Sequence, residues 1–258
     1  MLRMEPRTRK VLLRSGLVVV SLLLLAVLGF VWWALTPLGP SEEALEALKT
    51  DELVRVEEQP EGIVFTSTDG TSTVGFVFYP GGRVDVRSYA PLAREIAERG
   101  YLVVLVPMRL NLAVLSPNRA DSAIEAHPEI VSWVVGGHSL GGAMAARYAA
   151  DNIEHIDGLI LLGAYPPNGS DLSQSGIAVT SVVGTRDGVL DQDTFLEASR
   201  LLPANTAYVS IEGGNHAQFG SYGDQPGDMS ASIMPDDQRW DTVIAITETM
   251  LPLRIKAQ

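Results

Sequence analysis

The 258-residue sequence contains no cysteine. This absence excludes a disulfide framework, a thiol nucleophile, a thiolate metal site and lipid attachment through cysteine. The sequence also lacks a phosphate-binding loop, a dinucleotide-binding fingerprint and an H-E-x-x-H zinc motif. It shows no internal repeat and no low-complexity tract. We therefore expect neither a metal nor a cofactor.

Histidine is scarce, with four residues in the whole chain. His127 precedes a proline and His155 lies in a short polar segment, so we expect both to be surface or capping residues. His138 is the variable residue of a glycine-rich turn and is expected to point away from the nucleophile. Only His216, which follows the last predicted strand, is placed to act as a general base.

Basic residues are also few: the chain has 19 basic and 31 acidic residues, which give a formal charge of −12. The first 35 residues hold five of the basic and one of the acidic residues, so the remainder carries a formal charge of −16. An acidic surface disfavours nucleic acids and anionic lipid headgroups, and we expect no nucleic-acid partner. Solubility is the simplest role for most of this charge.

Charge is absent from one long segment, the 21 residues from Ser15 to Leu35. A helix of this length spans roughly 30 Å, the thickness of the hydrocarbon core of a bilayer. We interpret the segment as an uncleaved transmembrane signal anchor with Trp32 and Trp33 at its interfacial end. A cleaved secretory signal peptide is the alternative. The apolar part of such a peptide is usually only about 7 to 15 residues long and ends at small residues, which this run does not.

The flanking charges predict the orientation of this anchor, because positive residues stay on the cytoplasmic side. Five basic residues precede it (Arg3, Arg7, Arg9, Lys10 and Arg14) and three acidic residues follow it (Glu42, Glu43 and Glu46). We predict a cytoplasmic basic segment at 1–14, the anchor at 15–35, an acidic stalk at 36–53 and a hydrolase domain at 54–258 outside the cytoplasm. About 200 residues suffice for one well-buried domain.

Strand-like and helix-like runs alternate from residue 73 onward. The strands are expected at 73–79, 129–136, 157–164, 177–184 and 207–211, and the helices at 88–99, 119–126, 140–151, 192–201 and 239–250. This alternation predicts an α/β fold with a mostly parallel sheet covered by helices on both faces. No insertion is long enough for a lid domain, and only the loop from Tyr165 to Gly176 is placed to cover part of a site.

The most informative motif is a G-x-S-x-G turn, which runs from Gly137 to Gly141 and joins an apolar strand to a small-residue helix. The chain must reverse sharply at Ser139, and a Cβ at either flanking glycine would collide with the strand or the helix. The motif alone is weak, since it arises by chance in about one such sequence in six. Its position between a predicted strand and a predicted helix identifies Ser139 as a candidate nucleophile.

A serine nucleophile needs a base and a carboxylate that orients the base. Asp187 comes directly after one predicted strand, and His216 lies in a glycine-flexible loop after the next. Since the carboxyl ends of parallel strands share one edge of a sheet, we expect Ser139, Asp187 and His216 to converge there. Asp191 and Asp193 are alternative carboxylates.

An acyl-transfer site also needs N–H donors for the oxyanion. The N–H after the nucleophile belongs to Leu140. The second donor is expected in the glycine turn after the strand at 73–79, and we assign it to Gly82. Tyr165, Phe219 and Tyr222 are expected to line the pocket, and a cation site at Asp224 and Asp228 is a remote alternative use of the loop after His216.

From Val64 to Leu251 the chain resembles the α/β-hydrolase superfamily, and most closely its small lidless serine hydrolases. The resemblance is carried by the GHSLGG elbow, the Asp187-Gly188 pair and Asn215-His216. One departure concerns the oxyanion loop, where many members have His-Gly and this chain has Pro80-Gly81. Backbone N–H donors do not require that histidine, so the chemistry is retained. The assignment of the inward-facing N–H depends on the geometry of the loop.

These features predict a membrane-anchored serine hydrolase that cleaves a carboxylic ester, thioester or lactone through an acyl-enzyme. Its partners would be a small acyl substrate and, through the N-terminal helix, the membrane. A haloperoxidase-like or peptidase activity is a lesser alternative within the superfamily. A catalytically silent hydrolase fold that serves as a tethered binding or envelope-assembly module is the alternative from another class.

Overall fold

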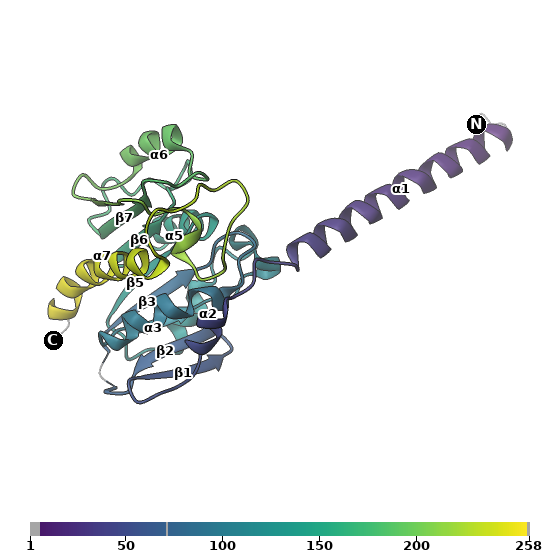
Figure 1. Cartoon of the computed structure of the whole chain (residues 1–258). Coiled ribbons are helices and arrows are strands. Elements are labelled where there is room, and N and C mark those ends of the chain that lie inside the picture. The colour runs from purple at the N-terminus through teal and green to yellow at the C-terminus, as the bar shows by residue number, and fades with distance from the viewer. Residues whose placement is uncertain (1–5, 71, 257–258) are drawn as a thin grey trace.

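The computed structural model describes residues 6–70 and 72–256. Within these residues eight strands form one sheet in the order β1-β2-β4-β3-β5-β6-β7-β8 (Figure 1). The strands are β1 (Val54–Gln59), β2 (Gly62–Ser67), β3 (Val74–Tyr79), β4 (Leu102–Leu105), β5 (Ser132–His138), β6 (Gly158–Leu162), β7 (Ala178–Gly184) and β8 (Ala207–Ile211). The β1-β2 and β2-β4 pairs are antiparallel, and the remaining neighbours are parallel.

Helices cover both faces of the sheet. The α-helices are α1 (Pro6–Ala34), α2 (Glu42–Glu46), α3 (Ala90–Glu98), α4 (Ala120–Ala126), α5 (Leu140–Asp151), α6 (Gln192–Ala198) and α7 (Pro235–Lys256). Short 3-10 turns are η1 (Val86–Tyr89), η2 (Arg109–Asn111), η3 (Ala113–Leu115), η4 (Ser199–Leu201) and η5 (Ala217–Phe219). The predicted mostly parallel α/β sheet is therefore confirmed.

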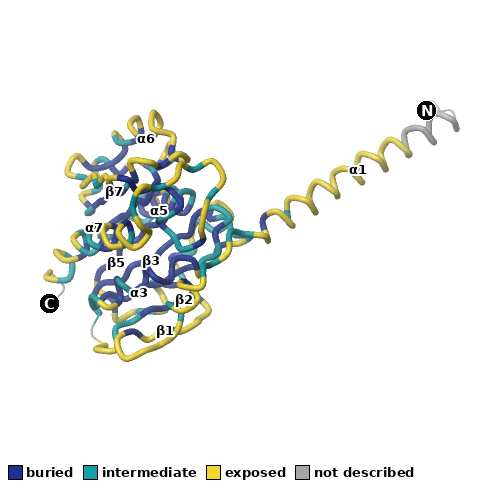
Figure 2. The backbone as a smooth tube through the Cα atoms, in the orientation of Figure 1, coloured by how far each residue is buried: buried dark blue, intermediate teal, exposed yellow. Residues whose placement is uncertain are grey.

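Alternate side chains of each strand belong to two different cores, as the pleat of a strand requires. Phe76 and Phe78 of β3 pack in the core beneath α3 and α7, whereas Val77 and Tyr79 pack in the core beneath α4 and α5. Both cores form continuous buried layers along the sheet (Figure 2). The sheet is thus held rigidly from both faces, and the loops at its edges are positioned by it.

The predicted elements differ from the observed ones mainly at their ends. The strand expected at 129–136 is β5 at 132–138, and the helix expected at 239–250 extends over 235–256. The helix expected at 88–99 is divided into η1 and α3, and the one at 192–201 into α6 and η4. Strands β1, β2 and β4 were not predicted. Of these, β1 is almost entirely exposed and carries little apolar signal.

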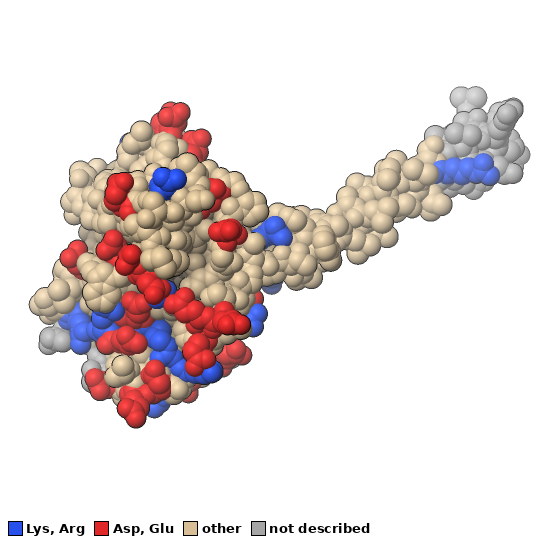
Figure 3. All heavy atoms as spheres, in the orientation of Figure 1, with Lys and Arg blue, Asp and Glu red and all other residues tan. Residues whose placement is uncertain are grey.

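Helix α1 leaves the domain on one side and extends away from it (Figure 1). Its segment Arg14–Ala34 has a mean hydropathy of 2.6 and is long and apolar enough to cross a membrane. In Figure 3 carboxylates are spread over the domain, whereas most of α1 carries no charged side chain. Residues 1–5 of the expected basic segment lie outside the described residues.

The segment 36–53, expected to form a stalk, lies against the domain. Leu38 forms a β-bridge with Val84, and Ala44 of α2 is fully buried. The Ser41 N–H donates to the Ser221 carbonyl at 2.8 Å. The end of α1 is therefore held directly on the globular domain, with no free spacer between them.

Candidate active site

The turn at Ser139 has the geometry that its glycines predict. Ser139 has φ 53° and ψ −124°, a left-handed backbone that is costly for a residue with a Cβ. A Cβ at Gly137 would lie 2.8 Å from the Gly141 carbonyl carbon, and one at Gly141 would collide with the Tyr79 carbonyl. Ser139 therefore stands on a sharp strand-to-helix turn between β5 and α5.

Asp187 and His216 meet at the same edge of the sheet, after β7 and β8. The His216 Nδ1–H donates to Oδ2 of Asp187 at 2.7 Å, and both side chains are buried. Oδ1 of Asp187 accepts from the N–H groups of Val189 and Leu190 at 2.9 and 2.8 Å. These two bonds hold the carboxylate in place, so that its second oxygen fixes the orientation of the imidazole.

Gly163, directly after β6, makes room for this pair. Its φ is +51°, and a Cβ there would lie 2.9 Å from Nδ1 of His216 and 3.1 Å from Oδ2 of Asp187. Any larger residue would displace one partner of the histidine–carboxylate bond. Gly163 carries no local sequence signal, because its importance comes from residues that are distant in the chain.

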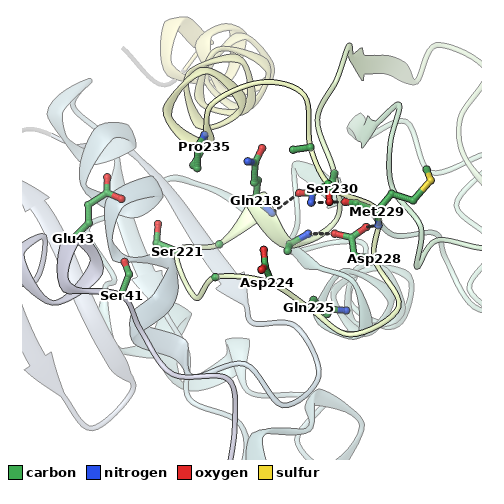
Figure 4. Close-up of a pocket in the computed structure, with 15 residues that line it drawn as sticks. Ser41, Glu43, Gln218, Ser221, Asp224, Gln225, Asp228, Met229, Ser230 and Pro235 are labelled. Carbon is green, nitrogen blue, oxygen red and sulfur yellow. Dashed lines mark hydrogen bonds between the residues drawn. The ribbon is translucent and has the colours of Figure 1, made fainter.

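Asp228 connects the two loops that carry Asp187 and His216. Its Oδ1 accepts from the N–H groups of Gly188 and Met229, both at 2.9 Å, and its Oδ2 accepts from that of Ala217 at 2.8 Å (Figure 4). The carboxylate is thus occupied by backbone donors. The alternative of a cation site with Asp224 gains no support from this geometry, because both oxygens of Asp228 accept from backbone N–H groups.

The histidine loop is also held from the side of α7. The Asn215 N–H donates to Oε1 of Gln238 at 2.9 Å, and Nε2 of Gln238 donates to the Asn215 carbonyl at 2.8 Å. The Asn215 side chain in turn bonds the Met229 carbonyl and the Gln218 N–H. His216 therefore sits in a loop whose neighbours are hydrogen-bonded on both sides.

His138 is fully buried beneath His216, with the two ring centroids 4.4 Å apart. The Gly81 N–H donates to the Tyr89 hydroxyl at 2.9 Å, which leaves the hydroxyl proton to donate to Nδ1 of His138 at 2.8 Å. Burial, and then the nearby His216, lower the pKa of His138 well below its usual 6.5. His138 is accordingly neutral at pH 7.

This hydrogen-bond chain determines which N–H groups of the glycine turn are free. Gly81 is occupied by Tyr89, and the Arg83 N–H donates to the Asn111 carbonyl at 2.8 Å. Within the described residues, no protein acceptor bonds the N–H of Gly82 or of Leu140. A Cβ at Gly82 would lie 3.2 Å from Cδ2 of Leu140, so the two predicted oxyanion donors are neighbours.

Ser139 and His216 line one cavity of about 280 Å³. Its other lining residues are Leu140, Ala143, Gly163, Ala164, Tyr165, Val189, Leu190 and Asp191. Tyr165 was predicted here. Phe219 and Tyr222 were predicted here too but are not among the lining residues: they are buried against His138, with centroids 5.6 and 6.5 Å from its ring.

The alternative carboxylates do not contact His216. Asp191 caps α6 by accepting from the Thr194 N–H at 2.8 Å, and Asp193 is exposed in the first turn of that helix. His127 lies between Glu61 and Glu129, and His155 is exposed. Of the histidines, only His216 combines a carboxylate partner with a place in the cavity of Ser139.

A larger cavity of about 610 Å³ lies on the other side of the histidine loop, between that loop and the α2 region (Figure 4). It is lined by polar residues that include Ser41, Glu43, Gln218, Asp224 and Asp228. Ser139, Asp187 and His216 do not line it. The smaller cavity is therefore the one that both the candidate nucleophile and the candidate base line.

Comparison with known proteins identifies one family. A model described as "Alpha/beta hydrolase family" matches residues 75–241. No curated protein matches the chain.

Several solved structures share the fold at low sequence identity. Est1E from Butyrivibrio proteoclasticus is 11% identical, with a TM-score of 0.56, and the match covers 77% of this chain and 99% of Est1E. A dienelactone hydrolase from Anabaena variabilis is 15% identical, with a TM-score of 0.56 and coverage of 76% and 98%. TT1662 from Thermus thermophilus is 14% identical, with a TM-score of 0.55 and the same coverage.

Proposed function

Since this chain belongs to the alpha/beta hydrolase family, we propose that it is a serine hydrolase that cleaves a carboxylic ester, thioester or lactone through an acyl-enzyme. The observation that carries the proposal is the buried His216–Asp187 hydrogen bond beside the cavity that Ser139 lines. Two similar structures are named as a dienelactone hydrolase and as Est1E with bound ferulic acid. Both names agree with acyl-ester chemistry.

In this proposal the Ser139 hydroxyl attacks the substrate carbonyl. His216 takes the proton on Nε2, because its Nδ1–H is engaged by Asp187 and Nε2 has no protein partner among the described residues. Asp187 selects this tautomer and stabilises the imidazolium that forms. The Oγ–C bond forms. The bond from the carbonyl carbon to the alcohol oxygen, the thiol sulfur or the lactone ring oxygen then breaks, and His216 returns the proton to this leaving group.

The N–H groups of Leu140 and Gly82 would bind the oxyanion of the tetrahedral intermediate. Both are free of protein acceptors in the described part of the chain, and Leu140 begins α5. The loss of one such donor typically lowers kcat by about 10² to 10³. Water then attacks the acyl-enzyme in the same site, with His216 again acting as base. No step requires a metal or a cofactor.

The test uses a fluorophosphonate probe, which reacts with activated serines. We expect labelling of the wild type and none of Ser139→Ala, while Ser210→Ala, which removes an exposed hydroxyl on β8, is labelled like the wild type. Equal labelling of the wild type and Ser139→Ala would remove Ser139 as the nucleophile. An unlabelled wild type with no turnover of esters would favour a silent binding or envelope-assembly module.

We further propose that α1 is an uncleaved anchor, with the N-terminus in the cytoplasm and the catalytic domain outside it. The charge on either side of the apolar segment supports this orientation. Retention is supported by the docking of its end: Ala34 is fully buried, and the Asn111 side-chain amide donates to the Ala34 carbonyl at 2.9 Å. Cleavage within the apolar run would remove residues that pack on the domain.

A further inference from the structure

The loop of residues 107–119, between β4 and α4, differs in composition from the rest of the domain. It contains two arginines, Arg109 and Arg119, and no acidic residue, in a chain with 31 acidic residues. Its tip is apolar: Val114 is 50% exposed and Leu115 is 43% exposed. Exposed apolar side chains beside arginine are typical of segments that lie in the headgroup region of a bilayer.

This loop adjoins the end of α1. Asn111 donates its side-chain amide to the Ala34 carbonyl, and its own carbonyl accepts from the Arg83 N–H. The Arg83 guanidinium donates to the carbonyls of Trp33 and Thr36 at 2.9 and 2.6 Å, and its carbon lies 4.3 Å from the centre of the Trp33 ring. The loop that carries the apolar tip is therefore joined, through Asn111 and Arg83, to the aromatic end of the proposed anchor.

The backbone of the loop is held in an unfavourable conformation. Leu110 and Asn111 have φ values of 52° and 53°, and this left-handed backbone is sterically unfavourable for a residue with a branched side chain such as Leu110. Strained residues of this kind cluster at functional segments. Here the hydrogen bonds of Asn111 to Ala34 and Arg83 keep the strain in place, so the shape of the loop is linked to the docking of α1.

The same edge of the sheet carries the candidate active site. Because β3 to β8 run parallel, the loops after β3, β4, β5, β7 and β8 all lie at one edge. The loops after β3 and β4 contact α1, and the loops after β5, β7 and β8 carry Ser139, Asp187 and His216. In addition, η3 of the loop packs against α5, whose residues Leu140 and Ala143 line the cavity of Ser139.

We propose that the 107–119 loop rests in the headgroup layer of the bilayer that α1 crosses, and that the site hydrolyses an amphiphilic acyl ester drawn from that leaflet. The inference rests on the proposed hydrolase function and anchor. The cavity has an apolar wall of Leu140, Ala143 and Val189, which suits an acyl chain. Water supplies the oxygen of the released carboxylate, and the alcohol part leaves with a proton.

The first test measures hydrolysis by the full-length protein in phosphatidylcholine vesicles. Two fluorogenic esters are compared, one with a long acyl chain that partitions into the bilayer and one short and water-soluble. We expect the double variant Val114→Ser/Leu115→Ser to lose about tenfold on the bilayer ester, since two apolar side chains no longer bury in the interface. Turnover of the soluble ester should stay unchanged, which also shows that the variant is folded.

The matched control is Leu53→Ser/Val131→Ser. These side chains are 62% and 66% exposed, and they lie before β1 and β5, at the opposite edge of the sheet. The control should hydrolyse both esters like the wild type. The inference fails if the 114/115 variant loses no activity on the bilayer ester, loses equally on both esters, or behaves like the control. Absence of turnover of both esters by the wild type would instead overturn the hydrolase function, and the leaflet substrate with it.

A second measurement does not depend on activity. Because the chain has no cysteine, Val114→Cys and Val131→Cys each provide a single site for an environment-sensitive fluorophore. We expect blue-shifted emission that is quenched by a lipid-borne quencher at position 114, and water-like, unquenched emission at position 131. Water-like emission at both positions would show that the loop does not contact the bilayer.

Discussion

Space around the imidazole of His216 is the tightest constraint at the scale of single residues. Gly163 approaches it from β6, Asp187 holds Nδ1, and His138 packs against the ring from below. Each of these residues limits where the imidazole can lie. A shift of about 1 Å in a catalytic group can cost about 10² in rate, so small changes at these positions should have large effects.

The first residue-scale prediction concerns Gly163→Ala. The new Cβ would lie 2.9 Å from Nδ1 of His216, so we expect kcat/KM to fall by about 10² and the free energy of unfolding by about 1–2 kcal/mol. Gly176→Ala is the control, because Gly176 also has a positive φ, +73°, but has no heavy atom near the position of a Cβ. It should share the loss of stability and keep full activity. Equal activities of the two variants would show that Gly163 does not determine the site geometry.

The second concerns the pH dependence of stability. The pKa of His138 is well below 6.5 in the folded protein, whereas the unfolded chain keeps the usual value. Below about pH 6.5 only the unfolded state gains this proton, so the free energy of unfolding should fall with decreasing pH, by up to about 1.4 kcal/mol per pH unit. Above about pH 6.5 the histidine is neutral in both states, so this loss of stability is absent.

Denaturant unfolding of the wild type and His138→Gln between pH 7.5 and 5 measures this contribution. The variant should lose stability overall, because Tyr89 loses its acceptor, but its stability should depend less steeply on pH. Identical slopes for both proteins would show that His138 takes up a proton in the folded state as readily as in the unfolded one.

At the scale of elements, the site depends on contacts between loops that follow different strands. Asp228 joins the loop after β7 to the loop after β8 through three backbone N–H groups. Tyr89, at the end of η1, joins the glycine turn after β3 to the turn at Ser139. The sheet brings the loops to one edge, and these two side chains hold them at the distances that the site requires.

Asp228→Asn tests this connection. An amide group cannot accept from all three N–H donors, so we expect the free energy of unfolding to fall by about 1.5–3 kcal/mol and kcat by at least about tenfold, with a smaller change in KM. Asp224→Asn removes an exposed carboxylate from the same loop and should leave both quantities unchanged. A loss of stability in Asp228→Asn with normal kcat would limit Asp228 to a structural role.

The sequence was sufficient for the elements whose signal is local. Ser139, Asp187 and His216 each follow an apolar strand, and a parallel sheet brings such ends together whatever lies between them. The β1-β2 hairpin and the roles of Gly163, Tyr89 and Asp228 were not predicted. Strand β1 of the hairpin has mostly polar, exposed residues, and Gly163, Tyr89 and Asp228 act through contacts with residues far away in the chain.

At the scale of the whole molecule, the acidic domain and the apolar α1 form two regions of opposite character (Figure 3). The α1 segment Arg14–Ala34 is 6% buried, so nearly all of its apolar surface lies outside the fold. Burial of that surface in a bilayer would remove it from water. The docked end of α1 then fixes which edge of the sheet lies nearest to the membrane.

Protease protection in intact cells tests the orientation. In the predicted topology the domain lies outside the cytoplasm, so we expect protease added to the cells to digest it. Carbonate extraction at high pH should leave the protein in the membrane fraction. An Ala26→Asp variant, with a charge at the centre of the apolar run, should be extracted, because such a charge costs about 2.5–3.5 kcal/mol in a membrane helix. A domain that is protected in cells but digested after lysis would reverse the predicted topology.

The short connection between α1 and the sheet restricts where this protein works. Only three residues lie between Ala34, the last residue of α1, and Leu38, which pairs with Val84, and the four extended steps from Ala34 to Leu38 reach about 14 Å at most. In the anchored protein that we propose, the domain would diffuse laterally with its own patch of lipid. Turnover would then follow the surface density of substrate in that membrane rather than its concentration in solution, and vesicles that lack the protein would keep their esters intact.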